Sequence, residues 1–145
     1  MRVLFVCTGN TCRSPMAEGL LRDIADKKNL DIEVASAGIY AHDGGPVAEN
    51  SIIAMNEIGI DISAYRTRKL SEEDLRWADL VLTMGNSHKN HIEDIYGFAG
   101  AKTFTLLEYV YGFKDDIADP FGGSLDIYKH TRDEIYQAIR EMELK

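Results

Sequence analysis

Residues 2–18 read RVLFVCTGNTCRSPMAE, and the fold expected for the rest of the chain follows from this stretch. Residues 3–6 form an apolar run of the length of one buried strand. A loop rich in small residues follows, and Pro15 then opens a helix, with Ser14 in the position of its N-terminal cap. A loop between a buried strand and a helix N-terminus presents backbone N–H groups and the positive end of a helix dipole, so it is suited to bind an anion.

A thiol stands at the start of this loop and a guanidinium at its end. Five residues separate Cys7 from Arg13, which lets the chain curl so that successive N–H groups point inward. We expect Gly9 to permit a positive φ, and Asn10 to bond within the loop or tolerate such an angle. A helix N-terminus and a nearby cation both lower the pKa of a thiol from about 8.5 to about 3.5–7.5. A nucleophile and a bidentate oxyanion clamp around a phosphate-sized nest are the parts of a thiol-based phosphoryl-transfer site.

Length and composition indicate one domain, residues 1–145, with enough chain for a hydrophobic core. The chain contains no run near the ~20 apolar residues that span a bilayer, and no basic start followed by a long apolar segment. We therefore expect a cytoplasmic enzyme. A net charge of −8 disfavours nucleic acid and anionic membranes as partners. No pattern in the sequence specifies an oligomeric state.

Both cysteines of the chain, Cys7 and Cys12, lie in the loop, so they do not form a disulfide framework. Two thiols without a nearby pair of histidines do not complete a tetrahedral metal shell, and we expect no metal and no other cofactor. We predict instead that peroxide joins the two thiols in a reversible disulfide that protects Cys7 from irreversible oxidation. The alternative for Cys12 is a small packing residue in the loop.

The remaining sequence alternates strands with helices. Further strands are expected at 32–37, 80–84 and 102–106. Helices are expected at 15–28, 47–58, from a capping box at Ser71 to 78, from a cap at Ser87 to about 96, in a short segment around Tyr109 and Val110, and at 124–143. This alternation predicts one α/β domain, a four-stranded parallel sheet with helices on both faces. Ligands of such folds bind at the carboxyl ends of the strands, where the Cys7 loop lies.

The chemistry also needs a general acid to protonate the leaving group. Asp119 is the candidate, because it precedes Pro120 in an extended conformation and glycines at 122–123 let the loop fold over the site. The same carboxylate can later activate water. On sequence alone a turn-forming Asp-Pro pair is the simpler interpretation. Asp115 and Asp116 are expected to be solvated.

Other polar side chains carry weaker expectations. Tyr40 and His42 follow the second expected strand, and each could equally form a wall of a substrate cleft or part of a surface loop. The remaining three histidines, His88, His91 and His130, occupy polar positions of expected helices. We expect these three side chains to lie at the surface.

The segment CTGNTCRSPMAE, residues 7–18, resembles the phosphate-binding loop of the low-molecular-weight protein tyrosine phosphatases. It is closer still to the bacterial protein-arginine-phosphatase branch of that family. The resemblance extends to SAG at 36–38, ADLVLTM at 78–84 and DPFGG at 119–123.

The resemblance implies a metal-independent phosphatase that acts on phosphorylated proteins through a phosphocysteine. It implies catalytic roles for Cys7, Arg13 and Asp119, the last as general acid. The phosphate-binding loop residues it implies are Thr8, Gly9, Asn10, Thr11, Cys12 and Ser14.

The resemblance also implies a bracing network for the loop. Asn10, Ser14 and Ser36 match positions that brace it by hydrogen bonds. Many members have a histidine that helps to hold Asn10, and in this chain Tyr65 is expected to take its place.

Thr11 is the residue expected to decide specificity. Tyrosine-specific members of the family usually carry Ile or Leu at this position, and the branch acting on phosphoarginine carries Thr. A side chain smaller than Ile by about one methylene leaves room for the planar guanidinium, and the hydroxyl is expected to bond Asp119. Phe121, followed by Gly122, leaves a narrow, partly apolar entrance that suits either substrate. Phosphoarginine is therefore the favoured substrate, and phosphotyrosine the alternative.

Two other functions are disfavoured by the sequence. A thiol-dependent arsenate reductase needs a distal cysteine to relay its disulfide, and no cysteine follows Cys12. A nucleotide-binding module needs Gly-Lys-Ser/Thr at the end of its loop, where this chain has Cys-Arg-Ser.

Overall fold

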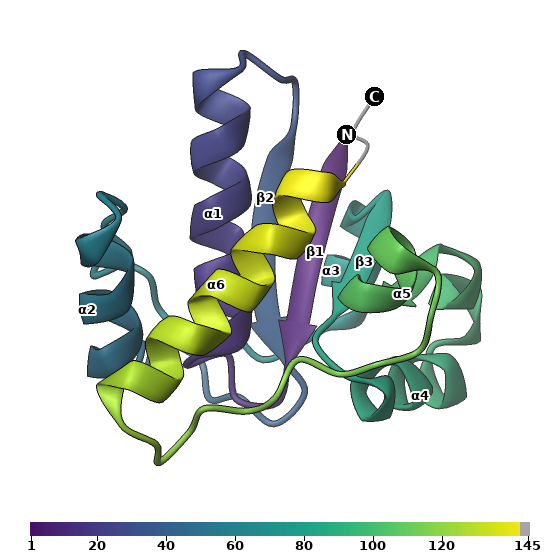
Figure 1. Ribbon diagram of the computed structural model, residues 1–145. Coiled ribbons are helices and arrows are strands. Elements are labelled where there is room, and N and C mark those ends of the chain that lie inside the picture. Colours follow the sequence, from purple (N-terminus) through teal and green to yellow (C-terminus); the bar gives the residue numbers. More distant parts are fainter. Residues whose placement is uncertain (143–145) are drawn as a thin grey trace.

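The computed structural model describes residues 1–142, and its centre is a sheet of four parallel strands (Figure 1). The strand order is β2-β1-β3-β4. The strands are β1 (Arg2–Cys7), β2 (Glu33–Gly38), β3 (Leu80–Thr83) and β4 (Thr103–Thr105). Residues 3–6 are fully buried in β1, because this strand has neighbours on both sides and helices on both faces. The fold class expected from the alternating pattern is thus confirmed.

Helices cover both faces of this sheet (Figure 1). They are α1 (Arg13–Lys27), α2 (Glu49–Glu57), α3 (Glu72–Trp77), α4 (Asn86–Ile95), the 3-10 helix η1 (Gly97–Lys102), α5 (Leu106–Tyr111) and α6 (Leu125–Glu141). One core contains Val3 and Phe5 with residues of α1, α5 and α6. The other contains Leu4 and Val6 with residues of α3, α4 and η1. The alternation of β1 side chains between two faces is the reason for these two layers.

Most expected elements occur within about two residues of their expected bounds, while two expected caps are wrong. Helix α1 begins at Arg13, and Ser14 is its second residue rather than its cap. Helix α4 begins at Asn86 after Gly85, one residue before the expected cap Ser87. The capping box of α3 is confirmed by reciprocal bonds between Ser71 and Asp74. The expected end of the last helix, at 143, lies outside the described residues.

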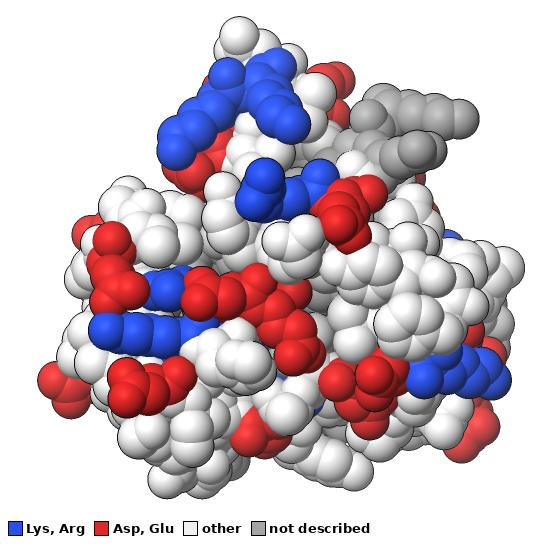
Figure 2. Space-filling view, viewed as in Figure 1, with Lys and Arg blue, Asp and Glu red and all other residues white. Residues whose placement is uncertain are grey.

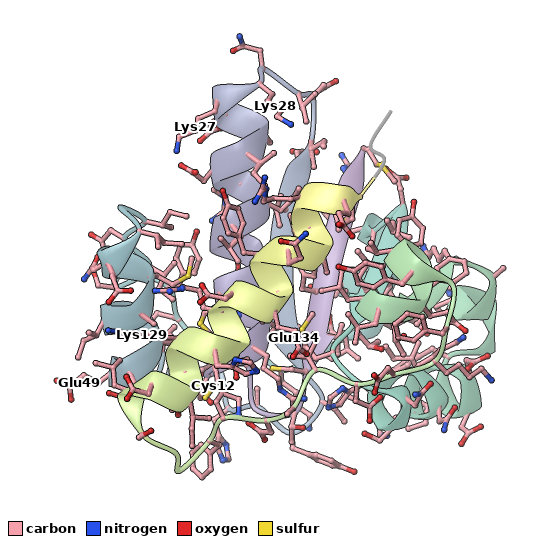
Figure 3. All side chains as sticks on the ribbon, viewed as in Figure 1. Cys12, Lys27, Lys28, Glu49, Lys129 and Glu134 are labelled. Atoms are coloured by element: carbon pink, nitrogen blue, oxygen red, sulfur yellow. The ribbon has the colours of Figure 1, made fainter. Side chains whose placement is uncertain are left out.

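The carboxyl ends of the strands form one end of the molecule. Cys12 lies at that end, whereas Lys27 and Lys28 lie at the opposite end of α1 (Figure 3). Gly38, the last residue of β2, approaches the loop so closely that a Cβ there would lie 2.7 Å from the backbone nitrogen of Asn10. Glycine at this position therefore lets the loop pack against the sheet edge.

Charged residues on the face in Figure 2 are interleaved over α2 and α6. Lys129 and Arg132 of α6 pair with Glu57 of α2, at 2.5 and 3.1 Å. Arg132 also pairs with Asp133 at 2.8 Å. In residues 1–142, no helix has the length and apolar character needed to cross a membrane.

Candidate active site

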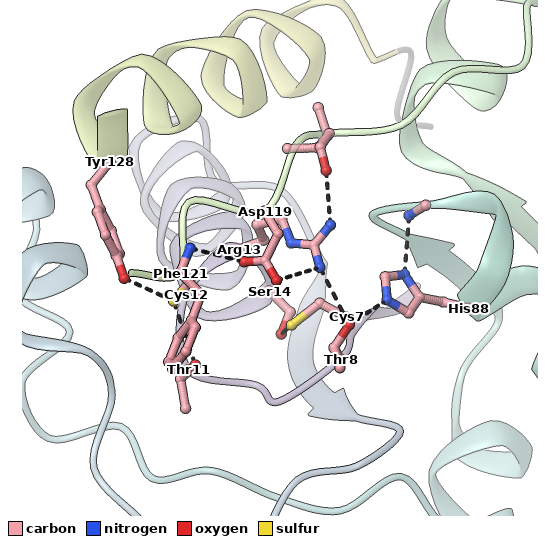
Figure 4. A network of polar contacts seen from close by, with 12 residues as sticks. Cys7, Thr8, Thr11, Cys12, Arg13, Ser14, His88, Asp119, Phe121 and Tyr128 are labelled. Carbon is pink, nitrogen blue, oxygen red and sulfur yellow. Dashed lines mark hydrogen bonds and ion pairs between the residues drawn. The ribbon is translucent and has the colours of Figure 1, made fainter. Parts of the chain in front are cut away.

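A cavity of about 440 Å³ opens at the carboxyl ends of the strands. The loop after β1, the segment after β2 and the segment before α6 all contribute to its walls. The lining residues are Cys7, Thr8, Gly9, Thr11, Cys12, Arg13, Tyr40, Ala41, His42, Gly45, Pro46, Thr67, Asp119 and Phe121. Cys7 and Asp119 are more than 100 residues apart in sequence. In the structure both of them and Arg13 line the same cavity (Figure 4).

Cys7 is 2% exposed, and its sulfur lies 2.9 Å from Ser14 Oγ. The side-chain amide of Asn10 donates to Ser14 Oγ at 2.7 Å and to Ser36 Oγ at 2.9 Å. The side-chain oxygen of Asn10 accepts the Arg68 backbone N–H at 2.9 Å, and this bond determines which end of the amide is the oxygen. Because Ser14 Oγ already accepts from Asn10, its own proton is free to point at the Cys7 sulfur. Ser14 is therefore placed to donate to a thiolate.

The bracing network continues behind the loop. Ser36 donates to Glu18 Oε1 at 2.6 Å, and Glu18 pairs with Arg22 at 2.7 Å. Tyr65 accepts from Arg22 at 2.5 Å and does not hold Asn10, so its expected role is wrong. The backbone N–H of Arg68 holds the Asn10 side chain instead. The role of Glu18 was not predicted from the sequence. Its position four residues after Ser14, about one helical turn along α1, was the feature that could have indicated it.

Asn10 has the left-handed backbone conformation in this loop, with φ of 57°. Gly9 is not among the residues with positive φ, so only the expectation for Asn10 is confirmed. The three hydrogen bonds of the buried Asn10 side chain stabilise a conformation that asparagine tolerates better than most residues.

Arg13 is buried and its guanidinium connects two segments of the site (Figure 4). Its Nη1 donates to the Ile117 carbonyl at 2.8 Å. Its Nη2 lies 3.4 Å from Thr8 Oγ1 and 3.6 Å from Asp119 Oδ2. Nε is buried and has no hydrogen-bond partner within residues 1–142. An unpaired buried N–H is costly, and an anion in the cavity would satisfy this one.

Asp119 is the exposed member of the group, with 49% of its side chain accessible. Besides the contact with Arg13, its Oδ1 accepts the Phe121 backbone N–H at 3.1 Å. The segment is anchored at Asp116, whose Oδ1 accepts from the backbone and side chain of Asn86 at 2.8 and 3.0 Å. Asp116 is exposed as expected, but it holds the start of α4.

Thr11 lines the cavity, and its hydroxyl lies 3.4 Å from the Cys12 sulfur. The expected bond from Thr11 to Asp119 does not occur among the hydrogen bonds of residues 1–142, because the hydroxyl is turned toward Cys12. Cys12 is buried and also lies 3.4 Å from the hydroxyl of Tyr128. Burial raises the pKa of the Cys12 thiol, and the negative charge of Asp119 adds to this. Both cysteines of the chain are free thiols.

Aromatic side chains stand at the rim of the cavity. Phe121 is 75% exposed and Tyr40 is 72% exposed, and both line the opening. The Tyr40 ring meets the partly buried His91 edge-on, with 6.0 Å between ring centroids. His42 also lines the cavity, so both wall candidates lie where the cleft interpretation requires.

His88 is buried, which contradicts the expectation of a surface residue. Its Nε2 lies 2.9 Å from Thr8 Oγ1, and its Nδ1 accepts the Gly85 N–H at 3.1 Å. Burial, with a smaller effect of the Arg13 charge, lowers the pKa of His88 to about 4. His130 is exposed as expected. The partner of His88 is 80 residues away in sequence, and no local pattern indicated that contact.

Residues 2–144 match the family of low molecular weight phosphotyrosine protein phosphatases. The chain belongs to this family. It is 46% identical to the protein-arginine-phosphatase of Bacillus subtilis, over 98% of this chain and 94% of that protein. It is 41% identical to the low molecular weight protein-tyrosine-phosphatase PtpB of Staphylococcus haemolyticus, over 98% and 97% of the two chains.

The solved structures of the family have the same fold. One of them is the C7S mutant of the YwlE arginine phosphatase with a phosphorylated active site serine. It superposes with a TM-score of 0.95 at 45% identity, covering 97% of this chain and 92% of that chain. Membership in the family makes this chain a cysteine-dependent protein phosphatase, as the resemblance in the sequence implied.

Proposed function

We propose that this phosphatase hydrolyses phosphoarginine in proteins, through a phosphocysteine intermediate at Cys7. The observation that carries the choice of substrate is Thr11, which lines the cavity beside Cys7. Its small side chain leaves the width that a guanidinium needs. The two relatives named protein-arginine-phosphatase support this choice, since they are 46% and 44% identical to this chain, against 36–41% for PtpB proteins.

In the first step the Cys7 thiolate attacks phosphorus, an S–P bond forms and the P–N bond breaks. The electron pair of the P–N bond goes to the guanidine nitrogen, which takes a proton from Asp119. Arg13 and the loop N–H groups hold the phosphoryl oxygens, with Nε of Arg13 as one of the donors. Ser14 and the N-terminus of α1 stabilise the thiolate before attack.

In the second step water attacks the phosphocysteine. The carboxylate of Asp119, which gave up its proton in the first step, accepts a proton from this water, so the residue acts first as a general acid and then as a general base. The S–P bond breaks, its electron pair returns to the Cys7 sulfur, and inorganic phosphate leaves. Asp119 lies near enough to Arg13, at 3.6 Å, to face an oxyanion held by that guanidinium.

The walls of the cavity suit a planar cationic leaving group. Asp119, ionised once it has given up its proton, faces the guanidinium product, and Phe121 and Tyr40 supply aromatic faces at the rim. Thr11 lacks about one methylene relative to Ile, a difference worth about 1–3 kcal/mol in a pocket. Because its hydroxyl faces Cys12, the effect of Thr11 on specificity is expected to be steric.

Hydrolysis of one phosphoarginine peptide and one phosphotyrosine peptide, measured side by side with EDTA present, tests this proposal. Wild type should prefer phosphoarginine, and Thr11→Ile should shift the ratio of kcat/KM toward phosphotyrosine by about 10- to 200-fold. Thr11→Val keeps the size and removes the hydroxyl, so it should leave the ratio near that of wild type. Preference of wild type for phosphotyrosine, with a ratio unaffected by Thr11→Ile, would identify a tyrosine phosphatase.

A further inference from the structure

His88 is a buried titratable residue that the proposed reaction does not use, although it touches the phosphate-binding loop. The directions of its hydrogen bonds follow from its partners. The Gly85 backbone N–H can only donate, so Nδ1 of His88 is an acceptor without a proton. The proton of the neutral ring is therefore on Nε2, which donates to Thr8 Oγ1 at 2.9 Å. The lowered pKa of His88 agrees with a neutral ring.

The same reasoning determines where the Thr8 hydroxyl proton points. A hydroxyl oxygen accepts about two hydrogen bonds and donates one. Thr8 Oγ1 accepts from His88 and, at 3.4 Å, from Nη2 of Arg13. Its own proton has no acceptor among the residues that the structure describes, and Thr8 lines the cavity with Cys7 and Asp119. The backbone carbonyl of Thr8 is separately held by the Tyr40 N–H at 2.8 Å.

We propose that His88 is a positioning residue that makes the Thr8 hydroxyl a hydrogen-bond donor to the bound phosphoryl group. Figure 4 shows the contacts of Thr8 with His88 and Arg13. Because these two donors occupy both lone pairs of Thr8 Oγ1, the hydroxyl proton is left to point into the cavity. The loop thereby gains a side-chain donor beside its backbone N–H groups. The inference rests on the proposed phosphate site at Cys7, and not on the choice between arginine and tyrosine.

The surroundings of His88 hold its ring in this role. It lies in the first turn of α4, where the Gly85 N–H restrains its Nδ1. Asn86 in the same turn binds Asp116 of the segment that carries Asp119. The first turn of α4 therefore contacts both the phosphate-binding loop and the segment of the general acid.

A double-mutant cycle with inorganic phosphate as competitive inhibitor tests the proposal, using an aryl phosphate as substrate. Thr8→Val and His88→Leu should each raise the inhibition constant of phosphate by about 10- to 100-fold, the size of one hydrogen bond to a charged group. The inhibition constant of the double variant should not exceed the higher of the two values for the single variants, because both changes remove the same donor. His130→Leu, the same change at an exposed histidine of α6, should match wild type.

His88→Gln restores an N–H that can reach Thr8 and should recover part of the affinity for phosphate. Thr8 is exposed, so Thr8→Val tests the donor even where His88→Leu does not fold. Wild-type phosphate inhibition in Thr8→Val would overturn the proposal. So would a His88→Leu variant that loses only thermal stability, or a double variant whose losses multiply. Neither probe contains arginine, so failure of the arginine assignment would leave these results unaffected.

Discussion

The two halves of the catalytic cavity are built differently. The loop at 7–14 is largely buried, and the Asn10 side chain alone makes three hydrogen bonds within and behind it. The segment at 112–124 is mostly exposed, and within residues 1–142 the polar partners of Asp119 are the Phe121 N–H and the Arg13 guanidinium. Arg13 joins the halves through Ile117 and Asp119.

This difference indicates that the halves have different tasks. A preorganised, buried loop can stabilise a thiolate and a phosphoryl group without rearranging during the reaction. A general acid on an exposed segment can adapt to leaving groups of different shape, at the cost of less defined geometry. Variants that remove Cys7 or its hydrogen bond to Ser14 should therefore impair every substrate, and variants of Asp119 should lower kcat/KM only for substrates whose leaving group needs protonation.

Cys7→Ser should give the largest effect. The hydroxyl is a poor nucleophile but keeps the shape of the loop, so turnover should be abolished for all substrates while vanadate still binds. Steady-state hydrolysis and vanadate binding by calorimetry measure both parts. Cys12→Ser, the same change at the other thiol, should retain turnover. Substantial activity in Cys7→Ser would exclude Cys7 as the nucleophile.

Asp119→Asn should lower kcat/KM for phosphoarginine, which reports formation of the phosphocysteine, by about 10²–10⁴-fold, because the amide cannot donate the proton. For an activated aryl phosphate the loss of kcat/KM should be much smaller, although kcat falls for both substrates because the hydrolysis of the phosphocysteine needs the same carboxylate. Asp116→Asn, three residues earlier, serves as the control, since Asp116 contacts Asn86 rather than Arg13. Equal losses of kcat/KM on both substrates would indicate that Asp119 is structural.

Ser14→Ala removes the hydroxyl that lies 2.9 Å from the Cys7 sulfur. A hydrogen bond to a charged group is worth about 1.5–3 kcal/mol, so kcat/KM should fall about 10- to 100-fold on either substrate. Ser51→Ala also deletes a buried hydroxyl, but one in α2 without a partner in residues 1–142, and should have little effect. A loss restricted to phosphoarginine would contradict the division between the halves.

Cys12→Ser should have the smallest effect on turnover and a distinct effect on oxidation. We predict that peroxide joins Cys7 and Cys12, so that dithiothreitol restores activity in wild type. In Cys12→Ser the activity lost to peroxide should not return. The raised pKa of Cys12 means that it exchanges as a thiolate more readily at alkaline pH. Equal recovery in both proteins would show that Cys12 is a packing residue.

The fold was predictable because its signals are local. The apolar run at 3–6 and the loop after it specify a central strand, and the alternating pattern specifies the sheet. Cys7 and Arg13 were predicted from the same local pattern, whereas Asp119 was preferred over a turn-forming Asp-Pro pair only through the resemblance to the family. The contacts of His88 and Tyr65 were not predictable, because they depend on how α4 and the segment before α3 pack against distant residues. The local sequence around a histidine at a polar helix position does not predict that it is buried.

Trapping the phosphoenzyme tests the central claim most directly. Asp119→Asn should still transfer phosphate from an activated aryl phosphate to Cys7, yet hydrolyse the product slowly, because it lacks the base that activates water. Rapid quenching followed by mass spectrometry of peptides should then find one phosphoryl group on the peptide that contains Cys7. Absence of protein-bound phosphate during turnover, or a phosphoryl group on any other residue, would contradict the account.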